Sequence, residues 1–436
     1  MKLNYVYAVA PLSNLVVALE WQQPLSERTI YNNGGPSIDP LNRIIDSSPL
    51  LSFHREIVRI PSISGHEKPV GDFIYDFIKS HNLTVEKQIV TSKSENEEER
   101  YNVFAYAGIN RFPDVLLTSH IDTVPPFVPY SLRSPVENWT HSVAFNRSDL
   151  VIAGRGTVDA KASVAAILFA ALETLEDNPD ASIGLLFDVG EENSGIGMKY
   201  FSNSDLNPSP SKFHTVIFGE PTELNLVAGH KGTLGLKVIA QGKAAHSGYP
   251  WLGKSAVTSL LPVISYLDTL QDISPHKGGL LRSDKFGRST LNIGIVRAGL
   301  AGNVVPAYAE ATITIRLAAG HPNDTRQIIK NAVQYVTGGD ENISLDFGDL
   351  DSGAPPQHLD TDVHGFDVIT VNYGTDIPSL KIYDGSHSKV KRYLYGPGSI
   401  HVAHSEGEAI TVGELENAVE GYKRLISAAL NGHETT

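Results

Sequence analysis

The chain has 436 residues, which is too long for one ordinary hydrophobic core, so we expect two domains. Hydrophobic residues make up 41% of the sequence and charged residues 19%, a balance typical of folded globular proteins rather than disordered chains. The formal net charge of −14 argues against nucleic acid or an anionic membrane surface as the main partner, and the absence of cysteine excludes disulfides and thiolate metal ligands.

The N-terminal residues resemble a secretory signal peptide. In MKLNYVYAVAPLSNLVVALEWQQ, a lysine is followed by a mostly apolar stretch and then by small residues near Ala18. Pro11, Ser13 and Asn14 interrupt this stretch, so an ordinary N-terminal segment is the alternative. We predict that residues 1–20 are a signal peptide and that the protein is secreted, with a vacuole as the alternative destination.

Sequons for N-linked glycosylation support secretion only mildly. Composition alone would give roughly three or four such matches, and the sequence has them at Asn82, Asn138, Asn146, Asn323 and Asn342. A secreted chain with these sequons is expected to be a glycoprotein. No later stretch is apolar enough over the length of a bilayer, so no membrane partner is expected.

From about residue 49, short apolar strands alternate with helices. The stretch 161–175 is apolar nearly all round, which predicts a buried helix. Strands are predicted at 103–107, 115–119, 183–189 and 216–218. Strands bounded by helices indicate a mixed α/β sheet with helices on both faces.

The pattern changes after Gly229. Strands are predicted at 231–240, 289–297 and 307–318, and helices at 254–270 and 323–336. Between 311 and 317 apolar residues alternate with polar ones, which predicts a sheet with one packed and one open face: Ile313, Ile315 and Leu317 against Thr312, Thr314 and Arg316. We predict that residues 229–342 form an inserted α+β domain.

The first pattern returns near the C-terminus. Residues 366–372 predict a strand and residues 413–430 a helix. The first domain is therefore predicted to be discontinuous, formed by residues 41–228 and 343–436.

Five short strands are each followed by an acid or a histidine in a Gly-rich loop, and strand ends are where ligands bind in open α/β sheets. The five places are TSHIDT with His120 and Asp122, GRGTVDAK with Asp159, FDVGEEN with Glu191 and Glu192, FGEPT with Glu220, and IHVAHSEGE with His404. Taken singly, each acid is more often a turn or cap residue than a ligand. Together they supply nitrogen and oxygen ligands suited to zinc or a similar divalent ion.

Two cations about 3.5–4 Å apart need a ligand with two oxygens between them. A carboxylate can bridge in this way and a histidine cannot, so we expect one acid in the middle and one histidine at each end. His120 is expected to bind a metal through one ring nitrogen, while Asp122 accepts a hydrogen bond from the other.

The complete motif series resembles the dizinc exopeptidases and deacylases that include glutamate carboxypeptidase, acetylornithine deacetylase, succinyl-diaminopimelate desuccinylase and the aminoacylases, that is, peptidase family M20. SHIDTVP, GRGTVDAKA, DVGEENSG and GEPT match in order and spacing, and GKAAHSG and GPGSIHVAH follow. The resemblance covers residues 50–430. It implies a mixed-sheet zinc-exopeptidase catalytic domain, an inserted lid and dimerisation domain, and a homodimer.

The resemblance also implies a role for each candidate residue. Asp159 would bridge two Zn²⁺ ions, with Co²⁺ or Mn²⁺ as alternative metals. One metal position would be completed by His120 and Glu220, and the other by Glu192 and His404. His401, three residues before His404, is an equally good ligand by residue type alone, and the family pattern favours His404.

Further roles come from the same family. Glu191 would be the general base, and the peptide bond after Asp159 is expected to be cis. His246 of the lid would stabilise the oxyanion, often across a dimer. Asn303 and Arg316 have the family's spacing for holding the substrate carboxylate; a surface strand residue is the alternative for Arg316.

These roles predict a secreted amidohydrolase that cleaves an amide bond next to a free carboxylate, in a small peptide or an N-acyl amino acid. An acetylornithine-type deacetylase is the alternative within the class, although a secretion signal speaks against it. A family member that binds ligands without catalysis is the alternative outside the class. Because Glu191 and all five candidate ligands are present, the sequence favours the enzyme.

Overall fold

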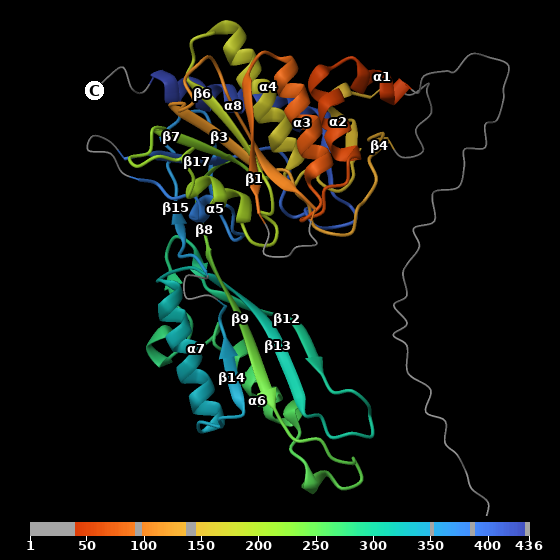
Figure 1. Ribbon diagram of the computed structural model, residues 1–436, viewed down its shortest axis with the longest axis vertical. Coiled ribbons are helices and arrows are strands. Elements are labelled where there is room, and N and C mark those ends of the chain that lie inside the picture. The colour runs from red at the N-terminus through yellow and green to blue at the C-terminus, as the bar shows by residue number, and fades with distance from the viewer. Residues whose placement is uncertain (1–39, 92–97, 137–144, 349–352, 384–388, 432–436) are drawn as a thin grey trace, which may run out of the picture. The chain divides into compact units, whose positions relative to one another are not determined.

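We describe a computed structural model of the chain, covering residues 40–91, 98–136, 145–348, 353–383 and 389–431 (Figure 1). The predicted signal peptide at 1–20 and the sequon at Asn138 lie outside these residues. In the described part of the chain, no helix combines the length and the apolar character that crossing a membrane would require.

The main sheet is mixed and has the strand order β1-β2-β6-β3-β7-β17. Strands β6, β3, β7 and β17 run parallel, while β2 pairs antiparallel with β6 and β1 antiparallel with β2. The bounds are β1 Thr84–Val90, β2 Arg100–Tyr106, β3 Val115–His120, β6 Ile183–Asp188, β7 Thr215–Gly219 and β17 Lys391–Tyr395. The predicted mixed α/β sheet is confirmed.

Alternate residues of β2, β3, β6, β7 and β17 enter different hydrophobic cores on the two faces of this sheet. In β3, Val115 and Leu117 join one core, whereas Leu116 joins the other. The first core contains residues of α1 Pro40–Asp46, α2 Pro49–Arg59, α3 Lys68–Ser80, α4 Lys161–Asp177 and α8 Val412–Asn431. The second contains Met198 and Phe201 of α5 Ile196–Ser202, so helices cover both faces as predicted.

A second sheet, with a core of its own, has the antiparallel order β12-β13-β9-β14. Its elements are β9 Gly232–Gln241, α6 Ala256–Thr269, β12 Thr290–Ala298, β13 Tyr308–Leu317, α7 Pro322–Thr337 and β14 Ile343–Asp346. Ile313, Ile315 and Leu317 are buried while Thr314 is exposed, so one face of β13 is packed and the other is open. We call this part the lid.

The lid sheet extends slightly beyond the predicted insertion. Residues 343–346 were assigned by sequence to the catalytic domain, but as β14 they pair with β9. The lid sheet therefore runs on to Asp346. The domain boundaries at 228 and 343 stay predictions.

Smaller elements complete the fold. A three-stranded sheet has the order β15-β8-β16, another has the order β18-β5-β4, and β10 pairs with β11. Their bounds are β4 Ser131–Arg133, β5 Val151–Ala153, β8 Leu226–His230, β10 Arg282–Ser283, β11 Gly287–Arg288, β15 Gln357–His358, β16 Val368–Val371 and β18 Ala409–Thr411. Short 3-10 helices are η1 Arg147–Asp149, η2 Pro250–Leu252, η3 Pro275–Lys277 and η4 Ile377–Ser379.

Candidate metal centre

The polar site lies at the carboxyl-terminal ends of the parallel strands. Because parallel strands end at the same edge of a sheet, residues distant in sequence meet there. His120 is the last residue of β3, Glu192 follows β6, and Glu220 follows β7 directly. Asp159 comes from the loop between β5 and α4, and His404 from the loop between β17 and β18.

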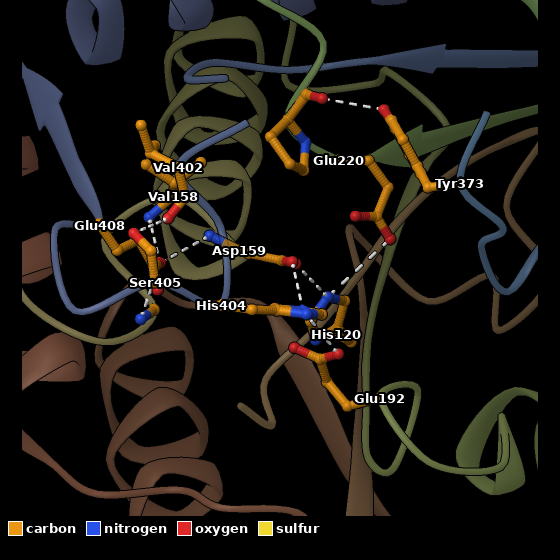
Figure 2. A network of polar contacts seen from close by, with 12 residues as sticks. His120, Val158, Asp159, Glu192, Glu220, Tyr373, Val402, His404, Ser405 and Glu408 are labelled. Carbon is orange, nitrogen blue, oxygen red and sulfur yellow. Dashed lines mark hydrogen bonds and ion pairs between the residues drawn. The ribbon is translucent and has the colours of Figure 1, made fainter. Parts of the chain in front are cut away.

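Asp159 lies between the two histidines (Figure 2). Its Oδ1 is 3.0 Å from Nε2 of His120, and its Oδ2 is 3.2 Å from Nε2 of His404. Glu192 Oε2 is 3.1 Å from the same His404 nitrogen, and Glu220 Oε1 is 3.9 Å from His120 Nε2. The structure thus brings together all five predicted ligands, and Asp159 turns one oxygen toward each histidine.

The donor set fits divalent cations. His120, Asp159 and Glu192 offer ligand atoms that all lie within 4.8 Å of one another. Oε1 of Glu192 is buried and has no hydrogen-bond partner among the described residues, although a buried carboxylate oxygen normally has one. Imidazole nitrogens and carboxylate oxygens are the ligands that zinc and related ions accept in proteins.

The electrostatics also favour bound positive charge. The carboxylates of Asp159 and Glu192 raise the pKa of His404 to about 10. Burial, together with neighbouring carboxylates, raises the pKa of Glu191 and of Glu220 well above the usual range, despite the opposing effect of His120. A cation held between these groups would offset the mutual repulsion of the carboxylates.

Asp122 supports the site in a way that the sequence only partly predicted. Nδ1 of His120 lies 3.0 Å from the main-chain carbonyl oxygen of Asp122, and 3.5 Å from its carboxylate Oδ1. The carboxylate accepts hydrogen bonds from the backbone N–H groups of Glu191 at 3.0 Å and Glu192 at 3.3 Å, and from the Ser64 hydroxyl at 2.6 Å. Asp122 therefore contacts His120 mainly through its backbone, and its side chain joins the ends of β3 and β6.

The structure separates the two histidines that the sequence left open. The His404 ring reaches Asp159 and Glu192, whereas His401 bonds through its backbone N–H to Ser399 Oγ at 3.3 Å. The Asp159–Ala160 peptide bond is cis, as predicted.

A cavity of about 690 Å³ opens onto the cluster. Among its lining residues are Asp159, Glu191 and Arg316 of β13. Gly374 leaves space for the guanidinium, because a Cβ on this residue would lie 3.0 Å from Arg316 Nη1. Burial lowers the pKa of Arg316 and nearby Glu191 opposes this, but an arginine stays charged at any physiological pH.

His246 and Asn303 lie elsewhere in the lid. In the described part of the chain, neither residue lines this cavity. The two chain segments that carry them pair with each other. The Ser247 N–H donates to the Asn303 carbonyl at 3.0 Å, and His246 forms a β-bridge with Val304. A single chain thus presents Arg316 beside the metal ligands, but not the predicted pair of Asn303 and Arg316.

Sequence reasoning missed several residues around the site. Tyr373 donates a hydrogen bond to the Pro221 carbonyl at 2.8 Å and lines the cavity. Asp376 is buried close to Asp188, and Glu408 is buried behind Asp159. The motifs YGTDIP and HSEGE contain Tyr373, Asp376 and Glu408, but residue type alone did not indicate these contacts.

Comparison with known proteins places the chain in a family. A model of the M20 peptidase dimerisation domain matches residues 228–339. A probable carboxypeptidase of Aspergillus oryzae is 67% identical over 430 residues, which cover 99% of this chain and 100% of the relative. The chain belongs to the M20 family of metallopeptidases. Membership makes it a peptide-bond hydrolase, the enzyme class that the motifs predicted.

Solved structures agree with the fold of this M20 metallopeptidase. A tripeptidase from Staphylococcus aureus has a TM-score of 0.66 at 18% identity, with 89% of this chain and 100% of that chain covered. An M20 family metallo-carboxypeptidase from Sulfolobus solfataricus has a TM-score of 0.64 at 18% identity, with 88% and 100% covered. The predicted combination of a zinc-exopeptidase-like catalytic fold and an inserted dimerisation-type domain is therefore confirmed.

Proposed function

We propose that this M20 metallopeptidase is a carboxypeptidase that releases the C-terminal residue of small peptides. The observation that carries the proposal is that Arg316 lines the same cavity as the metal-ligand cluster and Glu191. A guanidinium binds a carboxylate through two parallel hydrogen bonds. An amide bond next to a free carboxylate would thus be oriented toward the cluster, and N-acyl amino acids share this feature. The name of the Aspergillus oryzae relative supports the same activity.

The chain's own residues supply the remaining chemistry. His120, Asp159, Glu192, Glu220 and His404 would hold two divalent cations, which polarise a carbonyl and lower the pKa of a bound water when present. Glu191 would accept a proton from the attacking water and deliver it to the leaving nitrogen. Its backbone N–H is held by Asp122, and the residue lines the cavity.

We propose zinc as the native metal. Two histidines and three carboxylates around a solvent-accessible cavity match the ligand types of catalytic zinc, which keeps an open coordination position for water. Co²⁺ and Mn²⁺ remain the alternatives for the same donor set.

The purified protein should contain two metal equivalents per chain and should hydrolyse N-blocked dipeptides with a free C-terminus. The matched control is the same dipeptide as its C-terminal amide, which lacks the group that Arg316 would bind. Metal analysis measures the metal content, and product detection with and without chelator measures the metal-dependent hydrolysis. N-acetyl amino acids in the same panel test the deacylase alternative. Equal hydrolysis of the acid and the amide would contradict the assigned role of the carboxylate.

We also propose that the enzyme is secreted as a glycoprotein, on the basis of the apolar N-terminal stretch. The described sequon asparagines, Asn82, Asn146, Asn323 and Asn342, are all exposed, so oligosaccharide could reach them. N-terminal sequencing of protein collected from the culture medium of its host should begin near residue 20, and glycosidase treatment should lower its mass. An intact Met1 on protein found only inside cells would refute the proposal.

A further inference from the structure

A buried ion pair lies directly behind the metal-ligand cluster. Arg155 Nη1 and Glu408 Oε2 are 2.6 Å apart, and their side chains are only 2% and 1% exposed. The two residues are 253 positions apart in the sequence. Arg155 precedes Asp159 in the loop between β5 and α4, and Glu408 follows His404, so the pair joins the two loops that carry these ligands.

Glu408 holds the backbone of the first loop (Figure 2). Its Oε1 accepts hydrogen bonds from the N–H groups of Gly156 at 2.9 Å, Val158 at 3.0 Å and Asp159 at 3.1 Å. Hydrogen bonds to a carboxylate are shorter and stronger than those between neutral groups. The position of the Asp159 backbone therefore depends on a side chain that comes from the other loop.

Arg155 holds the backbone of the second loop. Its guanidinium donates to the carbonyl of His404 at 3.2 Å and to that of Ser405 at 3.1 Å, in addition to its contact with Glu408. His404 has a φ of 63°, a left-handed conformation that non-glycine residues adopt only when their surroundings hold them there. This conformation directs the His404 ring toward Asp159.

We propose that Arg155 and Glu408 are positioning residues for one metal position, the one formed by Asp159, Glu192 and His404. The pair sets the separation of the two loops, and hence the 3.2 Å between Asp159 Oδ2 and His404 Nε2. The other position shares Asp159 but takes its terminal ligands, His120 and Glu220, from the ends of β3 and β7, so it depends less on the separation of the two loops. This inference rests on the proposed pair of metals.

The ligand geometry, rather than stability alone, explains why such a pair is present. A buried ion pair can often be replaced by apolar residues at no cost in stability. Here each partner also binds backbone groups beside a metal ligand. A change in either partner should therefore alter the distance between two ligands, which a purely structural role would not do selectively.

The test is a titration of Zn²⁺ into chelator-treated full-length protein, followed by calorimetry. In Glu408→Gln the amide nitrogen would face Arg155, so the link between the loops should break while the side-chain shape is kept. We expect one of the two metals to bind about 10–100-fold more weakly and the other to keep its affinity. Glu406→Gln, an exposed acid in the same loop, is the matched control and should bind both metals as the unmodified protein does.

Arg155→Lys provides a second variant if Glu408→Gln does not fold by circular dichroism. A lysine can pair with Glu408 but cannot reproduce the planar fork that also reaches two carbonyls. Hydrolysis by a folded variant should recover at high Zn²⁺ concentration, because only metal occupancy has been lost. Unchanged affinity at both positions, or equal weakening at both, would overturn the inference alone. Binding of fewer than two ions by the unmodified protein would instead overturn the proposed metal pair, and this inference with it.

Discussion

Replacing Glu191 with glutamine is expected to lower kcat by about 10²–10⁴-fold, the usual contribution of a general base, with metal content unchanged. Glutamine has nearly the same shape but cannot accept the proton of an attacking water. The Asp122 carboxylate bonds to the backbone N–H of residue 191, and this contact survives the change because it does not involve the side chain.

The measurement is steady-state hydrolysis of an N-blocked dipeptide, with metal analysis of the same preparation. Glu176→Gln removes one negative charge from an exposed position on α4 and should leave kcat unchanged. A near-normal rate in Glu191→Gln would exclude this residue as the base. Loss of metal would instead indicate that Glu191 acts as a ligand.

His246→Ala is expected to lower kcat by about 10²–10³-fold, the typical effect of losing one oxyanion donor, again with metal content unchanged. His246 is exposed, and in the described part of the chain it does not line the cavity that contains Glu191 and Arg316. We therefore expect the active site to receive this histidine either by a movement of the lid or, as the predicted homodimer favours, from a second copy of the chain. Since the segment of Asn303 is hydrogen-bonded to that of His246, we expect both residues to reach the active site together.

The lid has a surface suited to such a dimer. β12 is an edge strand of the lid sheet, and Ile295 and Val296 on it are 44% and 54% exposed. An exposed apolar edge strand readily pairs with another chain. The match of residues 228–339 to a peptidase dimerisation domain supports the same arrangement.

Mixing the two impaired variants tests the shared site. In a heterodimer of Glu191→Gln with His246→Ala, one of the two sites would contain an intact Glu191 and an intact His246, so part of the activity should return. Sedimentation velocity should show a dimer. Full activity in a strictly monomeric protein, or a normal rate in His246→Ala, would contradict this expectation.

The sequence by itself determined the ligand chemistry of the centre and the fold class. Each candidate ligand ends a short apolar strand or lies in the loop that follows one, and both features are local: the strand is visible as an apolar run, and the ligand as an acid or a histidine after it. Parallel strands bring their ends to one edge, so a local pattern was enough to place His120, Glu192 and Glu220 together.

Only the tertiary structure decided which groups hold these ligands in place. His401 and His404 have the same residue type in the same loop, and the left-handed backbone of His404 distinguishes them. The Asp122 carboxylate lies 3.5 Å from the His120 ring and also bonds to the backbone of the residues that follow β6, a second contact that the sequence did not predict. Glu408 reaches Asp159 from 249 residues away in the sequence, a contact that no local pattern records. Such contacts arise from the packing of loops against one another, and periodicity and motif spacing carry no information about it.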